Sequence, residues 1–151
     1  SVIWNDLLVE AAQDCRLRVA ELPPQTPALE RLIAYFEAFL RYWLAHRDHF
    51  RFVFLSESSK TDLVELRQHL LGQAGAQAHF QQFSELVQTF LGKEPEEQGL
   101  AEQVRALAMY QAFGFLYCAI AVYNLPDELA ESQVQMVSSY LYQTLNHGIR
   151  A

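Results

Sequence analysis

Histidines and acidic residues at helical spacing are the residues best suited to metal chemistry. Residues three or four positions apart share one face of a helix, so their imidazole and carboxylate groups can converge on an ion such as zinc. The candidates are the pairs His46 and His49, Glu65 and His69, and, farther along, His79 and Glu85. Di-iron bundles use a Glu-x-x-His motif on two of their helices, and this chain has no such motif. We therefore predict no metal or other cofactor, and a small helical metal-binding bundle remains an alternative.

Nucleophilic and phosphate-binding chemistry has no motif to support it in this chain. The sequence contains no GxSxG, HExxH, P-loop or GxGxxG pattern, and such motifs are what place a nucleophile, a base or a phosphate. Cys15 and Cys118 lie far apart without a CxxC pair, which is typical of buried small hydrophobic residues in a reducing cytoplasm. We predict a cytoplasmic protein that is not an enzyme; a small helical enzyme is kept as an alternative.

The composition indicates a single aromatic-rich domain over residues 1–151. Hydrophobic residues make up 51% of the chain and charged residues only 19%, which argues against disorder. Ten Phe, seven Tyr and two Trp are more rings than a small core needs. The formal net charge of -7 disfavours direct contact between these residues and nucleic acid.

Few glycines and prolines interrupt the chain, and they cut it into helices. Apolar residues recurring at three and four predict an all-α bundle of about six helices. The expected ranges are 3–22, 26–45, 46–58, 62–91 with a break near 72–76, 100–123 and 126–147. The second helix is apolar on nearly every face, so it should lie in the centre of the domain.

Three local features refine these helices. Thr26 is expected to cap the second helix, with Pro27 in its first turn. Residues 50–54, FRFVF, also alternate like a strand, but we predict a helix because a lone strand would leave its backbone groups unpaired. Asp127 and Glu128 suit the positive start of the last helix.

The apolar run over residues 106–123 needs a cover on both of its sides. Its length approaches that of a membrane span, but acidic flanking residues and the lack of a second such segment argue against a membrane. Ala108, Ala112, Gly114 and Ala119 are small enough to allow close approach of another helix. We predict a homodimer built from the last two helices of each protomer; alternatively, the final apolar stripe packs on its own core. The predicted interface residues are Phe115, Ala119, Val122, Val134, Val137, Tyr140 and Leu141.

The central and final segments resemble those of a known family. An apolar helix, a turn containing a histidine and a Phe-rich short helix are formed by Phe39, Leu40, Trp43, His46, Phe50 and Phe54. With the final pair AMYQAFGFLYCAIAVY and VQMVSSYLYQTL, this order resembles the C-terminal regulatory domain of tetracycline-repressor (TetR) family transcription factors. Arg47 and Asp48 stand where family members frequently carry proline. The resemblance implies a bacterial transcriptional regulator whose DNA contacts come from an N-terminal helix-turn-helix domain, which residues 1–151 do not contain.

The resemblance also implies a pocket for a small-molecule effector inside each protomer, among the first, second, long and penultimate helices. The predicted lining residues are Trp4, Leu8, Tyr35, Phe36, Phe39, Trp43, Phe83, Val87, Tyr110, Gln111, Phe113 and Tyr117. Such pockets are mostly apolar with a few orienting polar groups, so we expect an aromatic or amphipathic ligand. Core packing is the competing interpretation for each ring. Glu37 would favour a cation if its carboxylate points inward, and a stand-alone helical interaction module is the remaining alternative function.

Overall fold

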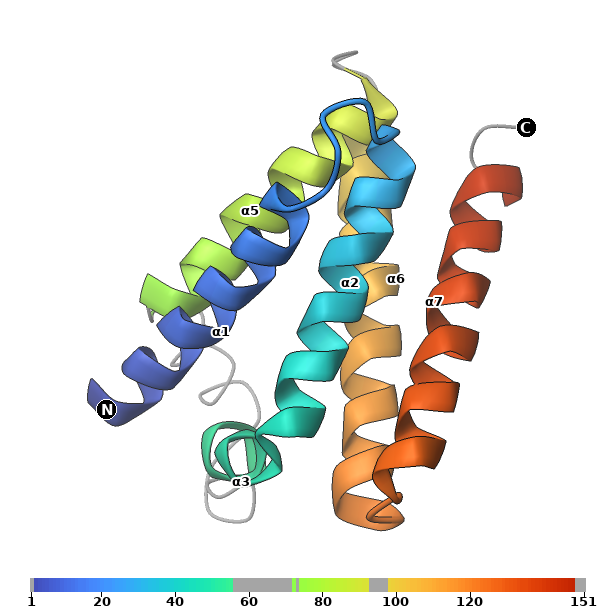
Figure 1. The fold of residues 1–151 in the computed structure, drawn as a ribbon. Coiled ribbons are helices and arrows are strands. Elements are labelled where there is room, and N and C mark those ends of the chain that lie inside the picture. The colour runs from blue at the N-terminus through green and yellow to red at the C-terminus, as the bar shows by residue number, and fades with distance from the viewer. Residues whose placement is uncertain (1, 56–71, 73, 93–97, 149–151) are drawn as a thin grey trace.

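A computed structural model describes residues 2–55, 72, 74–92 and 98–148. In chain order its elements are α1 (Val2–Ala20), α2 (Ala28–Ala45), α3 (Arg47–Phe50), the π-helical segment η1 (Arg51–Leu55), α5 (Ala74–Leu91), α6 (Gln98–Leu116), the π-helical segment η3 (Tyr117–Val122) and α7 (Asp127–Gly148). None of the described residues forms a strand. The all-α prediction is therefore confirmed, with six α-helices in the described part of the chain (Figure 1).

Helix α2 lies in the centre of the bundle. It packs against α1, α5, α6 and α7, and Figure 1 shows α1 and α5 on one side of it and α7 on the other. Leu32, Leu40 and Trp43 are fully enclosed, because neighbouring helices cover several of its faces. The central position predicted from its apolar sequence is confirmed.

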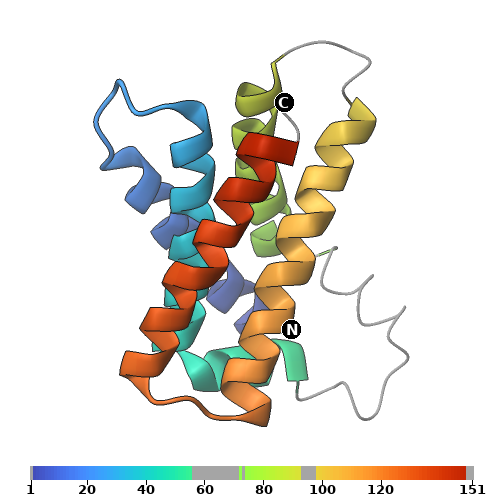
Figure 2. The same ribbon diagram turned by 90° about the vertical axis from the view of Figure 1, so that its right-hand side faces the viewer.

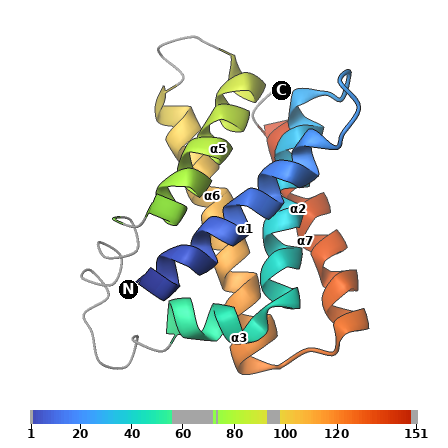
Figure 3. The same ribbon diagram turned by 60° about the vertical axis from the view of Figure 1, so that its left-hand side comes forward.

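Helices α1 and α5 cross in close contact (Figure 3). A Cβ atom added at Gly75 would lie 2.6 Å from the Val9 backbone nitrogen and 2.7 Å from the Leu8 carbonyl carbon, so only glycine fits there. The Asn5 side-chain oxygen accepts a hydrogen bond of 3.0 Å from the Gly75 N–H, which satisfies one free donor at the start of α5. The predicted break near 72–76 is confirmed by the start of α5 at Ala74.

The connection between α1 and α2 differs from the prediction at Thr26. Its hydroxyl donates to the Pro23 carbonyl at 2.7 Å, and no side chain caps α2, whose N-cap residue is Pro27. The predicted cap is wrong because the hydroxyl closes the preceding turn instead. Arg31 secures the same turn by donating to the carbonyls of Pro23 at 2.8 Å and Thr26 at 3.2 Å.

Two arginines join the short helical region α3–η1 to η3 and to the start of α7. Arg47 donates to the side-chain oxygens of Asn124 and Asp127, each at 3.2 Å. Arg51 donates to the Ile120 carbonyl at 3.2 Å. The FRFVF segment is helical, so the strand alternative is wrong.

Helices α6 and α7 lie side by side, and Figure 2 shows them together at the front. The apolar stripe of α7 faces the protomer's own core, where Val134, Leu141 and Leu145 are 0% exposed. Ala119 of η3 is also buried. Three of the predicted interface residues, Ala119, Val134 and Leu141, are therefore enclosed within the protomer's own core.

Some predictions fall on residues outside the described part of the chain. They are the first third of the helix expected over 62–91, the caps expected in 56–61, the pair Glu65 and His69, and most of the loop expected over 93–99.

Candidate functional site

A group of rings from four elements forms the candidate site, named here the aromatic cluster. Its members are Tyr35, Phe39 and Trp43 of α2, Phe54 of η1, His79 and Phe83 of α5, and Phe113 of α6. The α2 members recur every four residues and so share one helix face. Helices α5 and α6 both pack against α2 (Figure 1), and their rings meet this face.

The rings meet mainly edge to face, which suits the quadrupoles of aromatic systems. Phe39 is central: its ring centroid lies 5.3 Å from that of His79, 5.7 Å from that of Phe113 and 6.3 Å from that of Trp43. Phe54 closes the group at 5.3 Å from Trp43 and 5.0 Å from Phe113. The cluster is therefore one continuous group of packed rings at the core.

A hydrogen-bonded triad at one end of the cluster fixes the protonation of His79. The Tyr35 hydroxyl lies 2.9 Å from the Gln82 amide oxygen and 2.8 Å from His79 Nδ1. The amide oxygen can only accept, so it takes the single hydroxyl proton, and Nδ1 must donate to the hydroxyl oxygen. Burial lowers the pKa of His79 to about 4, so the ring is neutral at pH 7 and its Nε2 carries a lone pair.

Two ring nitrogens in the cluster have no hydrogen-bond partner in the described structure. Trp43 Nε1 is a buried donor, and His79 Nε2 is a buried acceptor. A buried polar atom left without a partner costs free energy of order 1–3 kcal/mol. The cluster thus presents one unused donor and one unused acceptor, both on rings that contact Phe39.

Burial also fixes the protonation of the neighbouring polar groups. It raises the pKa of the Tyr35 hydroxyl, with a smaller contribution from Cys15, and it raises the pKa of the Cys15 thiol, helped by Asp14. Cys15 packs with Tyr35 and Ala38 and is a free, buried cysteine, as predicted. Cys118 is free but exposed, so the prediction of burial is wrong there, because η3 turns this residue away from the core.

The structure brings together five of the twelve predicted ligand-binding residues: Tyr35, Phe39, Trp43, Phe83 and Phe113. Leu8, Phe36 and Val87 are buried in the main core, and Trp4 packs on Phe52 with ring centroids 6.1 Å apart. Gln111 has a buried side-chain oxygen without a hydrogen-bond partner in the described structure.

Tyr110 and Tyr117 do not belong to the internal group. They are 74% and 51% exposed, so the predicted inward face through Tyr110, Phe113, Gly114 and Tyr117 is wrong. Phe113 contacts Phe39 of α2, whereas Tyr110, Gly114 and Tyr117 are exposed.

The sequence interpretation did not include His79, Gln82 or Phe54 in the ligand site. His79 and Phe83 lie four positions apart on α5, so helical spacing gave a usable signal for the histidine. Phe54 had no comparable signal, since its place depends on the π-helical geometry of η1.

Metal-ligating side chains are dispersed in the described ranges, where no three His, Cys, Asp or Glu side chains gather. His46 and His49 do lie together, with stacked rings 5.3 Å apart. Glu65 and His69 lie outside the described residues, and His79 is occupied by the Tyr35 hydroxyl at Nδ1.

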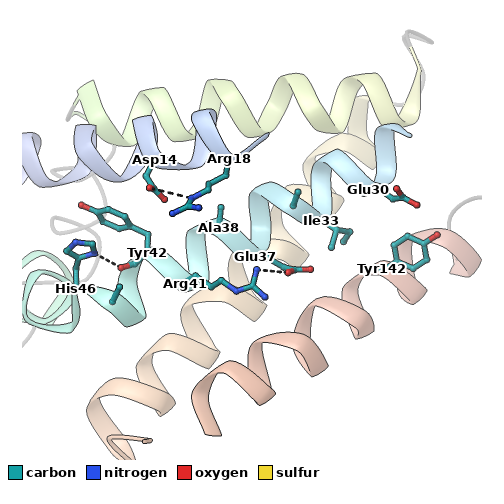
Figure 4. Close-up of a pocket in the computed structure, with 12 residues that line it drawn as sticks. Asp14, Arg18, Glu30, Ile33, Glu37, Ala38, Arg41, Tyr42, His46 and Tyr142 are labelled. Carbon is teal, nitrogen blue, oxygen red and sulfur yellow. Dashed lines mark hydrogen bonds and ion pairs between the residues drawn. The ribbon is translucent and has the colours of Figure 1, made fainter. Parts of the chain in front are cut away.

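A pocket of about 530 Å³ lies apart from the aromatic cluster, between α1, α2 and α7 (Figure 4). None of the twelve predicted ligand-binding residues lines it. Glu37 does, and it bonds to Arg41 rather than pointing into the core. The described structure therefore has an aromatic interior and a separate, charged surface pocket.

One helical stretch among the described residues, Gly99–Val122, is long and apolar enough to cross a membrane by length and composition alone. The core helix of a soluble protein passes the same test, and 33% of the apolar window is buried in the bundle. This fits a helix with one face on its own domain and the other uncovered.

The chain matches no protein-family model, no curated protein and no solved structure.

Proposed function

We propose that the chain is the effector-sensing and dimerisation domain of a TetR-like bacterial transcriptional regulator. In this proposal it is a cytoplasmic homodimer without membrane contact, and DNA is bound by a separate helix-turn-helix domain. The nitrogens of Trp43 and His79, which are buried among aromatic rings without a hydrogen-bond partner in the described part of the chain, carry the proposal. Native proteins rarely leave buried polar atoms unpaired, so a missing partner is a reason to expect a ligand.

The two nitrogens define the chemistry of the effector. Trp43 Nε1 requires an acceptor, and His79 Nε2 requires a donor. A neutral aromatic compound with one hydroxyl group supplies both functions, and its ring would pack edge to face with Phe39. A charged effector is disfavoured, because no described side chain of opposite charge belongs to the cluster and an unpaired charge there would be costly.

Effector binding would act on DNA by changing the populations of two alternative arrangements of the helices. A ligand among α2, α5 and α6 would favour one position of α5, and α1 follows α5 because the two helices are in direct contact at Gly75. Movement of α1 would change the spacing of two recognition helices, which must match major grooves about 34–36 Å apart. A coupling free energy of about 1–3 kcal/mol suffices for such control.

A thermal-shift screen of simple phenols tests the effector site. A ligand present at about 100 times its Kd should stabilise the fold by about 2.7 kcal/mol. Trp43→Phe removes only the N–H donor and keeps a ring, and should weaken binding by about five- to tenfold, the worth of one hydrogen bond. Tyr110→Phe, which also removes one polar group, is the control and should bind as the wild type does.

The proposal fails if no phenol raises the melting temperature. It also fails if Trp43→Phe keeps the full response, since binding would then take place elsewhere. The unliganded melting temperatures of both variants show whether a loss of response reflects a damaged fold.

The dimerisation part of the proposal is supported by an exposed apolar face, which we call the outer face. It comprises Tyr110, Tyr117, Val122, Tyr123, Leu129, Met136 and Tyr140, each at least 45% exposed, on α6, η3, α7 and the turn between them. Of the predicted interface residues, Val122 and Tyr140 are exposed and Phe115 and Val137 are partly buried. Large apolar side chains gathered on adjoining helices are typical of protein contacts.

Sedimentation tests this interface. Tyr140→Asp should convert a dimer at micromolar concentration into a monomer, because a charge would be buried without a partner. Leu17→Asp makes the same kind of change at an apolar residue that is 52% exposed on α1, and should leave the dimer intact. A wild-type monomer at that concentration, or equal effects of the two variants, would contradict the proposed interface.

A further inference from the structure

The pocket between α1, α2 and α7 is lined by both apolar and charged side chains. Ile33, Ala34 and Ala38 are among the apolar ones, and the tyrosines Tyr42 and Tyr142 also line it. Figure 4 shows Tyr42 and Tyr142 towards opposite ends of the pocket, with α2 running between α1 and α7. Its volume of about 530 Å³ lies within the range of small-molecule sites.

Negative charge exceeds positive charge around this pocket. The lining holds the carboxylates of Asp14, Glu30 and Glu37 but only two guanidinium groups. Asp14 pairs with Arg18 at 3.8 Å, whereas Glu30 has no ion pair within the described residues.

Arg41 does not offset the excess negative charge of the pocket, because two carboxylates share its single positive charge. Its guanidinium lies 2.8 Å from Glu37 Oε2 and 2.8 Å from Glu131 Oε1. These contacts raise the pKa of Arg41 and lower that of Glu131, in both cases chiefly through the hydrogen bond between them. Glu37 and Glu131 together therefore keep one uncompensated negative charge beside the pocket.

The carboxylates near the pocket also affect the pKa of the Tyr42 hydroxyl. Its pKa is raised to about 12, first by burial and then by the carboxylates of Glu10 and Asp14, with a further contribution from Cys15. The phenol therefore stays neutral. Its ring stacks on His46 at 4.2 Å between centroids, so it adds apolar surface to a pocket whose excess negative charge attracts a cation.

We infer that this pocket binds an organic cation with a short apolar body, such as a protonated alkylamine. The ammonium group would lie near the Glu37 carboxylate, with Glu30 adding negative charge about two turns earlier on α2, and the alkyl chain would cover Ile33 and Ala38. Anions of the same size would be repelled by the excess carboxylates. The site is separate from the aromatic cluster, because Glu37 and Arg41 follow a different face of α2 from Phe39 and Trp43.

Three probes of equal chain length distinguish the contribution of charge to binding from that of apolar contact. Hexylammonium, 1-hexanol and hexanoate are titrated into the protein, and binding is followed by backbone NMR shifts and calorimetry. Hexylammonium should bind at least tenfold more tightly than either of the others, with the largest shifts on α1, α2 and α7. Its affinity should fall as NaCl is added, because salt screens exposed charges.

Two substitutions of opposite expected effect test the role of charge. Glu37→Gln removes a carboxylate and should weaken hexylammonium binding by about three- to tenfold. Arg41→Met releases Glu37 and Glu131 and should strengthen it by a similar factor. Glu102→Gln, at an exposed carboxylate of α6 outside the pocket, should leave the affinity unchanged.

Damage to the fold would weaken binding in both pocket variants, so the opposite signs distinguish electrostatics from structure. Equal binding of hexanol and hexylammonium overturns the inference, as does unchanged affinity in Glu37→Gln or weaker binding in Arg41→Met. Shifts confined to the aromatic cluster or to the outer face overturn it as well.

Discussion

Gly75 of α5 lies directly against the backbone of α1, and Gly75→Ala tests that packing. The added Cβ would lie 2.6 Å from the Val9 nitrogen and 2.7 Å from the Leu8 carbonyl carbon. Both are backbone atoms, which cannot rotate away as a side chain can. The helices must therefore separate, or the start of α5 must shift and lengthen the bond from the Gly75 N–H to the Asn5 oxygen.

The expected cost follows from these contacts. Overpacking costs about 1–3 kcal/mol, and the fixed backbone on one side places Gly75→Ala at the upper end. Replacing glycine by alanine in a helix returns up to about 1 kcal/mol, so the net loss should be about 2 kcal/mol. For a chain of this size, the melting temperature should fall by roughly 4–8 °C.

Gly99→Ala is the matched control. Gly75 and Gly99 are each the second residue of their helix, but a Cβ at Gly99 meets no atom within 4 Å. Gly99→Ala should therefore be neutral or slightly stabilising. Urea unfolding followed by circular dichroism measures both variants. If Gly75→Ala proves as stable as Gly99→Ala, the close contact between α1 and α5 does not exist in the protein.

Three further predictions concern the core, a buried histidine and the turn before α7. Leu141→Ala should cost about 2–5 kcal/mol of unfolding free energy at every protein concentration, because Leu141 is 0% exposed. A loss of stability that disappears when the protein is diluted to monomer would instead show that Leu141 lies in the dimer interface. The pKa of His79 in the folded state, about 4, lies below its ordinary value of 6.5, so the unfolded chain takes up the proton first. The melting temperature should therefore fall as the pH drops from about 6.5 to 4. His79→Gln should flatten that part of the melting-temperature curve, and an unchanged curve in this variant would contradict the burial of the ring. Asn124 has a φ of 45° and accepts a hydrogen bond from Arg47, so Asn124→Ala should cost about 1–2 kcal/mol in urea unfolding. Asn124→Gly should recover part of that loss, and equal stability of the two variants would show that backbone strain is not involved.

The sequence by itself determined the helical elements and the central place of α2. Its apolar residues recur at helical spacing, and this period depends only on local geometry. A helix that is apolar on nearly every face needs neighbours on all sides, so residues 28–45 could be placed in the centre before any contact was known. The break before Ala74, expected from the glycines Gly72 and Gly75, followed from helix propensity in the same way.

The tertiary structure decided which side of each outer helix faces inwards. Leu141 and Tyr140 are neighbours on α7, yet one is enclosed and the other is 65% exposed. On an apolar segment such as α6, several faces satisfy the helical period equally well, so Tyr110 and Phe113 could not be separated by spacing.

The polar pairings were also beyond the sequence. The triad of Tyr35, His79 and Gln82 joins two helices about 44 positions apart in the chain, and the two carboxylates that share Arg41 lie on α2 and α7. Such pairings depend on how rigid helices cross, and the crossing is set by the shapes of many side chains at once. Close contacts such as that at Gly75 have the same origin: the sequence shows a glycine, and only the packing of α1 against α5 shows why no other residue fits.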